Sequence, residues 1–136
     1  MLDIGLEVNI EVMPSSSLKT AKANGKLDVF RASWVADYPD AQNYLSLFFS
    51  DNFTPNGPNY THFKNAKYDS LYRKAMSESD VKKRINLYKK MDRIVLEEAP
   101  VVVLFYDEVV RFTQKNIKGL GINPTNLLEL KNVQKN

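Results

Sequence analysis

The side chains best suited to binding chemistry lie between residues 31 and 45, RASWVADYPDAQNYL. This stretch holds the only tryptophan of the chain, Trp34, followed three positions later by Asp37 and then by a Tyr-Pro-Asp turn. A carboxylate beside an indole can hold a cation, such as an amine, through a charge-assisted hydrogen bond. An aspartate in a turn also commonly accepts a hydrogen bond from its own turn. The residues alone therefore leave Asp37 open between a ligand-binding role and a structural one.

The other reactive residue types do not form a catalytic pattern. The only histidine, His62, lies in a polar loop without a nucleophile motif or a metal-ligand spacing nearby, and the chain has no cysteine. Glu97 and Glu98 end a predicted helix, and no phosphate-binding glycine loop or EF-hand spacing is present. We therefore expect that the protein is not an enzyme and has no catalytic residues, metal site or cofactor.

The segments around Asp37 alternate between predicted strand and predicted helix. Alternating residues 4–10 indicate a strand, residues 15–24 a short helix that ends at Gly25, and residues 27–34 a second strand. Strand, helix and strand in this order favour parallel pairing and a layered α/β fold. In such folds ligands bind beyond the carboxyl ends of the strands, which is the position of Asp37.

The rest of the chain is predicted to be helical first and extended afterwards. The helical part comprises a helix over residues 41–50, a polar loop over 51–66, an amphipathic helix over 67–77 and a longer one over 81–98 that is capped by Asp80. The apolar run VVVLFY, residues 101–106, indicates a buried strand, and residues 109–113 indicate another. The tail from residue 115 onward is predicted to be irregular.

Length and charge exclude some classes of protein and leave others open. The chain has 136 residues, enough for one domain, and no apolar run long enough to cross a membrane. It shows no signal-peptide pattern and opens inside a predicted strand, so we expect it to be a piece of a longer protein. Residues 64–93 hold ten Lys or Arg and four acids. That window is consistent with nucleic-acid binding, but the missing aromatic interleaving favours a solvated helix surface.

Taken in order, the features of residues 3–113 resemble the C-terminal part of oligopeptide-binding and dipeptide-binding proteins. These proteins are the family 5 extracellular solute-binding components of peptide ABC importers. Each shared feature is weak alone, but their order is specific. The features are a strand ending in the motif W-x-A-D-Y-x-[DE] at Trp34 to Asp40, a helix, a Tyr/Asn loop, a Tyr68-Asp69 helix start, a helix with Arg84 and Leu87-Tyr88, and an Ala99-Pro100 break into an apolar strand.

The resemblance implies a fold, a location and partners. The fold would be the C-terminal fragment of a two-lobed, periplasmic-binding-protein-like (type II) α/β fold, with a mixed sheet and flanking helices. Residues 1–36 would be a βαβ piece of one lobe that ends in the hinge strand, and residues 37–136 a piece of the other lobe. The whole protein would be periplasmic or a cell-surface lipoprotein, with its signal region outside this chain. Its partners would be an oligopeptide ligand and the membrane permease of an ABC importer.

The resemblance also implies roles for individual residues. Asp37 would bind the ammonium group of the peptide, and Trp34 would form the wall of a side-chain pocket. The strand through Ser33 would offer backbone groups to an extended peptide. Arg31 would meet the carboxylate of a short peptide. The expected ligand-binding residues are Asp37, Trp34, Arg31, Ser33, Val35 and Tyr38.

Other functions and assemblies stay open at this point. A receptor of the same family could carry a non-peptide cargo, such as a nickel chelate, heme or a sugar, although the W-x-A-D-Y motif favours peptide. A small basic nucleic-acid-binding domain is the third hypothesis, and we expect no nucleic-acid partner. Val35 after the tryptophan and Ala41 after the acid depart from the family pattern and bear on pocket shape. Strand edges left exposed in a fragment favour a dimer or a strand swap.

Overall fold

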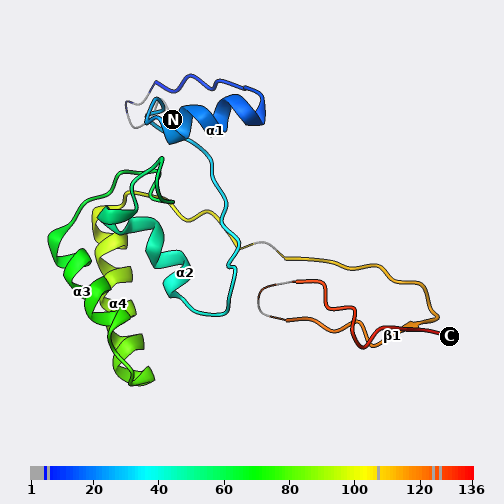
Figure 1. Cartoon of the computed structure of the whole chain (residues 1–136). Helices are drawn as coiled ribbons and strands as arrows, with labels where there is room; N and C mark the ends of the chain where they lie inside the picture. The colour runs from blue at the N-terminus through cyan, green and yellow to red at the C-terminus, as the bar shows by residue number, and fades with distance from the viewer. Residues whose placement is uncertain (1–4, 6, 107, 124, 126) are drawn as a thin grey trace.

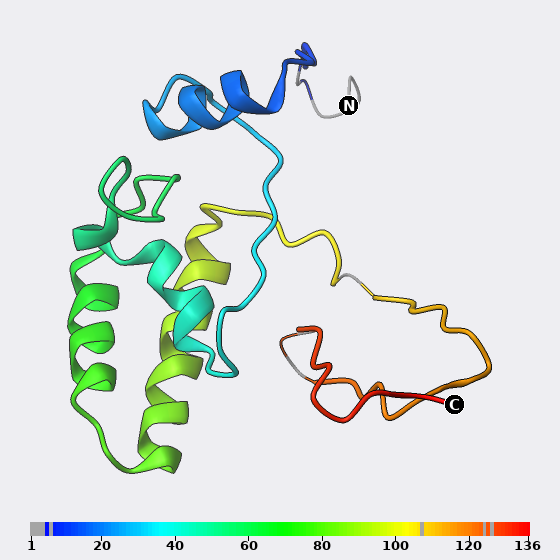
Figure 2. The same ribbon diagram turned by 45° about the vertical axis from the view of Figure 1, so that its right-hand side comes forward.

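The computed structural model describes residues 5, 7–106, 108–123, 125 and 127–136. Three parts follow one another along the chain (Figure 1). A first helix lies beside the loop at one end of a central helical body, and an extended segment leads from this helix into the body, as both views show (Figure 2). The last part, from residue 101 onward, is a long extended arm that leaves the body and folds back on itself at its far end. The candidate site lies on the segment between the first two parts.

The first helix, α1 (Ser15–Ala23), confirms the predicted short helix. It begins after Pro14, whose carbonyl accepts from the Leu18 N–H at 3.0 Å. Asn24 is its C-cap, and Gly25 follows with a φ of 61°, a left-handed conformation that glycine adopts without steric cost. Lys22 connects α1 to the body, because its ammonium lies 5.2 Å from the ring centre of Tyr60.

The body is built on the helical hairpin of α3 (Ala66–Met76) and α4 (Val81–Glu98), both close to their predicted bounds. Each helix begins with a side-chain cap. The Asn65 side chain accepts from the Tyr68 N–H at 2.9 Å, and Asp80 accepts from the Lys83 N–H at 3.0 Å. The C-cap of α4 is Ala99, which has a left-handed conformation directly before Pro100.

The core lies between α3, α4 and the segment that precedes them. Apolar residues at helical spacing supply it, as the sequence pattern predicts. The buried apolar residues are Leu45, Phe63, Tyr68, Tyr72, Ala75, Leu87, Tyr88, Met91, Ile94 and Val95. Phe48, Phe63 and Tyr68 meet edge to face, with ring centres 5.7 to 6.4 Å apart.

The prediction of one continuous helix over residues 41–50 is wrong. The chain forms α2 (Gln42–Leu45), then the short 3-10 turns η2 (Ser46–Phe48) and η3 (Ser50–Asn52), with Phe49 extended between them. Side chains occupy the carbonyls that a longer helix would use. The Ser46 hydroxyl donates to the Asn43 carbonyl at 2.9 Å, and the Asn52 amide donates to the Ser46 carbonyl at 2.9 Å.

The predicted mixed sheet does not form among the described residues. Their one ladder pairs β1 (Ile117–Lys118) with β2 (Gln134–Lys135), antiparallel, with Ile117 opposite Lys135. The segments predicted as strands at 27–34, 101–106 and 109–113 have no ladder, and their apolar side chains are largely exposed, up to 95% for Phe112. A strand exists only through hydrogen bonds to a neighbour, which local sequence does not supply. The prediction for 4–10 falls in part on residues outside the described ones, and 7–10 are likewise without a ladder.

Candidate functional site

The candidate site forms where the extended segment reaches α2, and Asn43 organises it. The indole N–H of Trp34 donates to the Asn43 side-chain oxygen at 2.6 Å. Asn43 is only 3% exposed, whereas Trp34 keeps 37% of its surface accessible. The indole is therefore held in place by a buried amide while one part of it stays open to solvent.

The same amide connects Trp34 to Asp37. The nitrogen of the Asn43 side chain lies 3.5 Å from an oxygen of the Asp37 carboxylate, a long hydrogen bond. Asp37 is exposed, and within the described part of the chain it accepts no hydrogen bond from a backbone N–H. The amide oxygen accepts from the indole and the amide nitrogen donates to the carboxylate. The Asn43 side chain therefore keeps Trp34 and Asp37 on one side of α2.

The turn is stabilised by Asp40 rather than by Asp37. The Asp40 carboxylate accepts from the Gln42 N–H at 2.9 Å, and its carbonyl accepts from the Asn43 N–H at 3.1 Å. Arg84 on α4 lies 3.5 Å from the same carboxylate. Burial raises the pKa of the nearby Tyr88 to about 12, and its hydrogen bond to Asp40 adds to the rise. Asp40 thus fixes the start of α2 to α4 and leaves Asp37 without that structural task.

Tyr38 is held on the outer side of the turn. Its hydroxyl donates to the side-chain oxygen of Gln42, and the side-chain nitrogen of Gln42 donates to the Tyr72 hydroxyl on α3. Burial raises the pKa of Tyr72, and the hydrogen bond from Gln42 acts in the opposite direction. Through Gln42, the residue that follows Asp37 is connected to the helical body.

The remaining predicted site residues lie along the extended segment. The side chains of Arg31, Ser33 and Val35 are exposed. The backbone N–H and C=O groups of residues 31–35 make no hydrogen bond to other backbone groups among the described residues. The structure brings Trp34, Asp37 and Tyr38 together around α2, and it leaves Arg31, Ser33 and Val35 on a free backbone edge. Asn43 and Gln42 were not among the predicted site residues, because their roles depend on contacts across turns.

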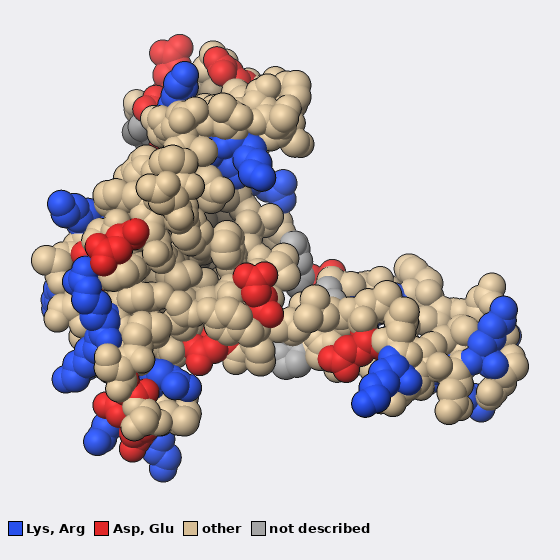
Figure 3. Space-filling model, in the orientation of Figure 1, with Lys and Arg blue, Asp and Glu red and all other residues tan. Residues whose placement is uncertain are grey.

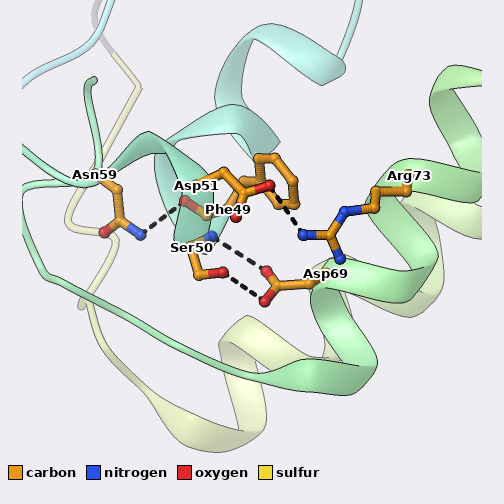
Figure 4. A network of polar contacts seen from close by, with 6 residues as sticks. All are labelled: Phe49, Ser50, Asp51, Asn59, Asp69 and Arg73. Atoms are coloured by element: carbon orange, nitrogen blue, oxygen red, sulfur yellow. Dashed lines mark hydrogen bonds and ion pairs between the residues drawn. The ribbon is translucent and has the colours of Figure 1, made fainter. Parts of the chain in front are cut away.

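A second polar network fixes the loop after α2 to α3 (Figure 4). Asp69 is 6% exposed and accepts from the Ser50 N–H at 3.1 Å and from the Ser50 hydroxyl at 2.6 Å. On the outer side, Arg73 forms an ion pair with Asp51 at 2.9 Å and lies 5.0 Å from the ring centre of Phe49. This network explains the Tyr-Asp helix start as a structural feature, since the aspartate is bonded to Ser50.

The loop itself is organised around Asn59, which is fully buried. Its amide nitrogen donates to the carbonyls of Phe49 and Phe63 at 3.1 and 3.0 Å. The Phe63 N–H donates back to its oxygen at 3.2 Å. His62, directly before Phe63, has a φ of 51°. Its ring meets that of Phe53 edge to face, with the ring centres 5.2 Å apart. The histidine therefore makes packing contacts within its own loop.

Two further kinds of feature are absent from the part of the chain that the structure describes. Among the described residues, no group of three or more His, Cys, Asp or Glu side chains is arranged to hold a metal ion. None of the helices in that part of the chain has the length and hydropathy of a membrane span.

Comparisons with known proteins point in one direction. Residues 1–56 match the family model "Bacterial extracellular solute-binding proteins, family 5 Middle". The periplasmic murein peptide-binding protein MppA of Escherichia coli is 31% identical over 121 residues, which are 89% of this chain and 22% of that protein. The dipeptide-binding protein DppE of Bacillus subtilis is 26% identical, over 98% of this chain and 24% of its own. The probable deoxycholate-binding protein YgiS of Escherichia coli is 28% identical, over 88% and 22%.

The structural comparison agrees. The unliganded open form of MppA superposes with a TM-score of 0.66 at 30% identity, covering 73% of this chain and 18% of the MppA chain. This chain spans between a fifth and a quarter of the length of the curated relatives described above.

Proposed function

From the premise that this chain is similar to the family 5 extracellular solute-binding proteins, with the fold of part of a two-lobed periplasmic binding protein, we propose that it supplies part of the site of a peptide receptor. The predicted resemblance is confirmed by the match to the family, and the predicted two-lobed, periplasmic-binding-protein-like fold is confirmed by the superposition on MppA, although the mixed sheet is not formed among the described residues. Such a receptor acts by binding its cargo and not by catalysis, in line with its relatives, which are binding proteins.

One observation carries the proposal: the buried amide of Asn43 holds Trp34 and the exposed Asp37 together at the end of a free backbone edge. The free N–H and C=O groups of residues 31–35 suit an extended peptide that adds as a strand. Backbone pairing of this kind ignores side chains, and so it tolerates many peptide sequences.

The two ends of a peptide need opposite charges. The exposed carboxylate of Asp37 suits the terminal ammonium, because a charge-assisted hydrogen bond is stronger than a neutral one. The indole of Trp34 forms a wall for a side chain. Arg31, exposed on the same segment, suits the carboxylate of a short peptide through a bidentate pair. Ser33 and Val35 contribute backbone groups to the peptide. Tyr38 borders the site at the turn before α2.

The setting of the whole receptor belongs to the same proposal. Two of the relatives described above, MppA and YgiS, are named periplasmic proteins, and we place this protein outside the cytoplasm, as a periplasmic protein or a surface lipoprotein. Its partners are then an oligopeptide and the membrane permease of an ABC importer. Residues 1–36 lie in one lobe and residues 37–136 in the other, with the hinge at Trp34 to Asp37.

The decisive experiment replaces Asp37 in a full-length receptor that contains this chain. We expect Asp37→Asn to lower the affinity for a peptide with a free amino terminus by about tenfold to a hundredfold, which corresponds to the loss of a hydrogen bond to a charged group. The N-acetylated peptide lacks the ammonium and responds little. Asp92→Asn is the matched control, because Asp92 is an exposed aspartate on α4. Calorimetry that finds equal losses for both peptides would assign Asp37 a structural role.

The 136-residue chain alone is expected to bind peptide weakly or not at all, because it spans only about a quarter of its relatives. Micromolar affinity in calorimetry would contradict this expectation. The exposed apolar segments also favour a dimer or a strand swap of the isolated chain. Light scattering after size exclusion reports the mass directly, and a monomer at all concentrations would exclude it.

A non-peptide cargo is the second candidate, because one relative carries the name of a deoxycholate-binding protein. The two candidates differ in charge at the site. Deoxycholate is an anion, which an exposed carboxylate at Asp37 repels, whereas a peptide amine is attracted. In a full-length receptor, tighter binding of deoxycholate than of any free-amine peptide would favour the second candidate.

A further inference from the structure

The outer face of α4 carries a row of cations that the proposed peptide site does not use. Lys82, Lys89 and Arg93 are spaced by seven and four residues, so they lie along one side of the helix. All three are exposed, and the residues buried on α4, among them Met91 and Val95, lie on the opposite side. We call Lys82, Lys89 and Arg93 the basic stripe.

The basic stripe has two exposed acids of α4 at neighbouring positions, Asp92 and Glu97, and neither forms an ion pair with it. None of its three residues takes part in an ion pair within the described part of the chain. The two arginines of the hairpin that do form ion pairs, Arg73 and Arg84, lie outside the stripe. Exposed Lys83 and Lys90 lie close by on the same helix. Figure 3 shows Lys and Arg side chains, with some Asp and Glu between them, along the edge of the molecule that α3 and α4 form. This edge presents a positive field to a partner.

The surroundings of the basic stripe indicate which anionic partner fits. Two aliphatic side chains lie next to it, Ile85 and Leu96, and both are exposed, Leu96 by 66%. The only aromatic residue of α4 is Tyr88, which is buried in the core. Single-stranded nucleic acid is held by aromatic stacking, which this face does not offer. Cations flanked by aliphatic side chains on one helix face are typical of helices that bind the surface of an anionic membrane.

We propose that the basic stripe of α4 docks the protein on an anionic phospholipid surface. The lysine and arginine side chains approach the phosphate groups, and Ile85 and Leu96 enter the boundary between headgroups and acyl chains. Each lysine or arginine near such a surface adds about a fivefold gain in affinity, which is weak alone and useful in combination. The contact orients the receptor relative to the membrane without involving Asp37 or Trp34.

The test compares two variants of equal charge. Lys82→Gln/Lys89→Gln/Arg93→Gln removes the basic stripe and keeps helix propensity. Lys115→Gln/Lys118→Gln/Lys131→Gln removes three exposed cations of the arm and gives the same net charge. Both are measured by co-sedimentation with vesicles of phosphatidylglycerol and of phosphatidylcholine, after circular dichroism has shown equal helix content.

We expect the wild-type chain to bind phosphatidylglycerol vesicles and to lose that binding as salt is raised. The stripe variant should bind about a hundredfold more weakly, and the arm variant close to wild type. Equal losses in both variants would mean unspecific attraction and overturn the proposal. Equal binding to phosphatidylcholine would mean adsorption through the exposed apolar segments, with the same consequence. Tighter binding to DNA than to the anionic vesicles, in a gel shift, would also overturn it. None of these readouts involves peptide, so the proposal fails or stands separately from the proposed function.

Discussion

Asn43→Ala tests whether one buried amide organises the candidate site. In the wild-type chain this amide accepts from the Trp34 indole at 2.6 Å and approaches Asp37 at 3.5 Å. Alanine removes both contacts but keeps the helical backbone of α2, because alanine is the best helix former. The expected result is a small loss of global stability with a large local change at Trp34.

The size of the global effect follows from exposure. A neutral hydrogen bond contributes about 0.5–1.5 kcal/mol to stability, and the partly exposed indole can turn to water for a replacement. We therefore expect a loss of about 1 kcal/mol, or a shift of about 0.5 M in the urea midpoint for a slope of about 2 kcal/mol per molar. We expect a larger local effect, because the indole of Trp34, which is 37% exposed when the amide holds it, can turn further into solvent once the amide is removed.

Intrinsic fluorescence measures this local effect without a label, since Trp34 is the only tryptophan. In Asn43→Ala, the emission should shift to the red and the acrylamide quenching constant should rise roughly twofold, as local opening exposes the ring. The matched control is Asn86→Ala, at an exposed asparagine of α4, which should leave emission unchanged.

The reasoning is refuted if Asn43→Ala leaves both the emission and the quenching of Trp34 at their wild-type values. Such a result would mean that packing rather than the amide holds the indole. An emission shift of the same size in Asn86→Ala would point to global loosening and would equally remove Asn43 from its role.

Three further predictions concern the frame of the site. Burial raises the pKa of Tyr68 above its ordinary value of 10.0, so its contribution to stability is complete below pH 10 and is lost as pH rises beyond it. Tyr68→Phe, which leaves the Leu45 carbonyl without its 2.6 Å donor, should lower the urea midpoint at pH 7 and flatten the decline between pH 10 and 12; an unchanged decline would contradict this. Asp69→Asn should cost about 1.5–3 kcal/mol in urea unfolding, because the neutral amide keeps only one acceptor oxygen for the two donors of Ser50 and loses the charge that strengthens both hydrogen bonds; a loss under 0.5 kcal/mol would speak against it. Met91→Ala should cost about 2–5 kcal/mol, since Met91 is fully buried in the core, and near-wild-type thermal stability would show that the core collapses around the gap.

The helices were predictable because their signals are local. The apolar spacing of residues 81–98 and the cap at Asp80 both lie within the segment that they shape, and the structure places the helix there. The broken helix around Ser46 was not predictable in the same way, because Asn52 reaches back six residues to take its carbonyl. The spacing of apolar residues does not show that a side chain farther along the sequence donates a hydrogen bond to such a carbonyl.

The strands and the centre of the site depend on contacts between distant segments. The apolar residues of 101–106 have the composition of a buried strand, but burial and pairing require neighbours that composition does not contain. Trp34 and Asp37 could be singled out by their residue types and spacing. Asn43 could not, because its role arises only when the turn at Asp40 brings α2 against the indole nine residues earlier.

The left-handed alanine after α4 has a mechanical consequence. Ala99 has φ and ψ of 47° and 46°, and Pro100 has a φ that its ring fixes near −65°. Glycine at position 99 would relieve the strain of a left-handed Cβ, but it would also free the torsions that set the direction in which the chain continues. With alanine and proline the joint has little torsional freedom. The direction of residues 101–106 at their start is therefore set by the direction of α4, and a change in one changes the other.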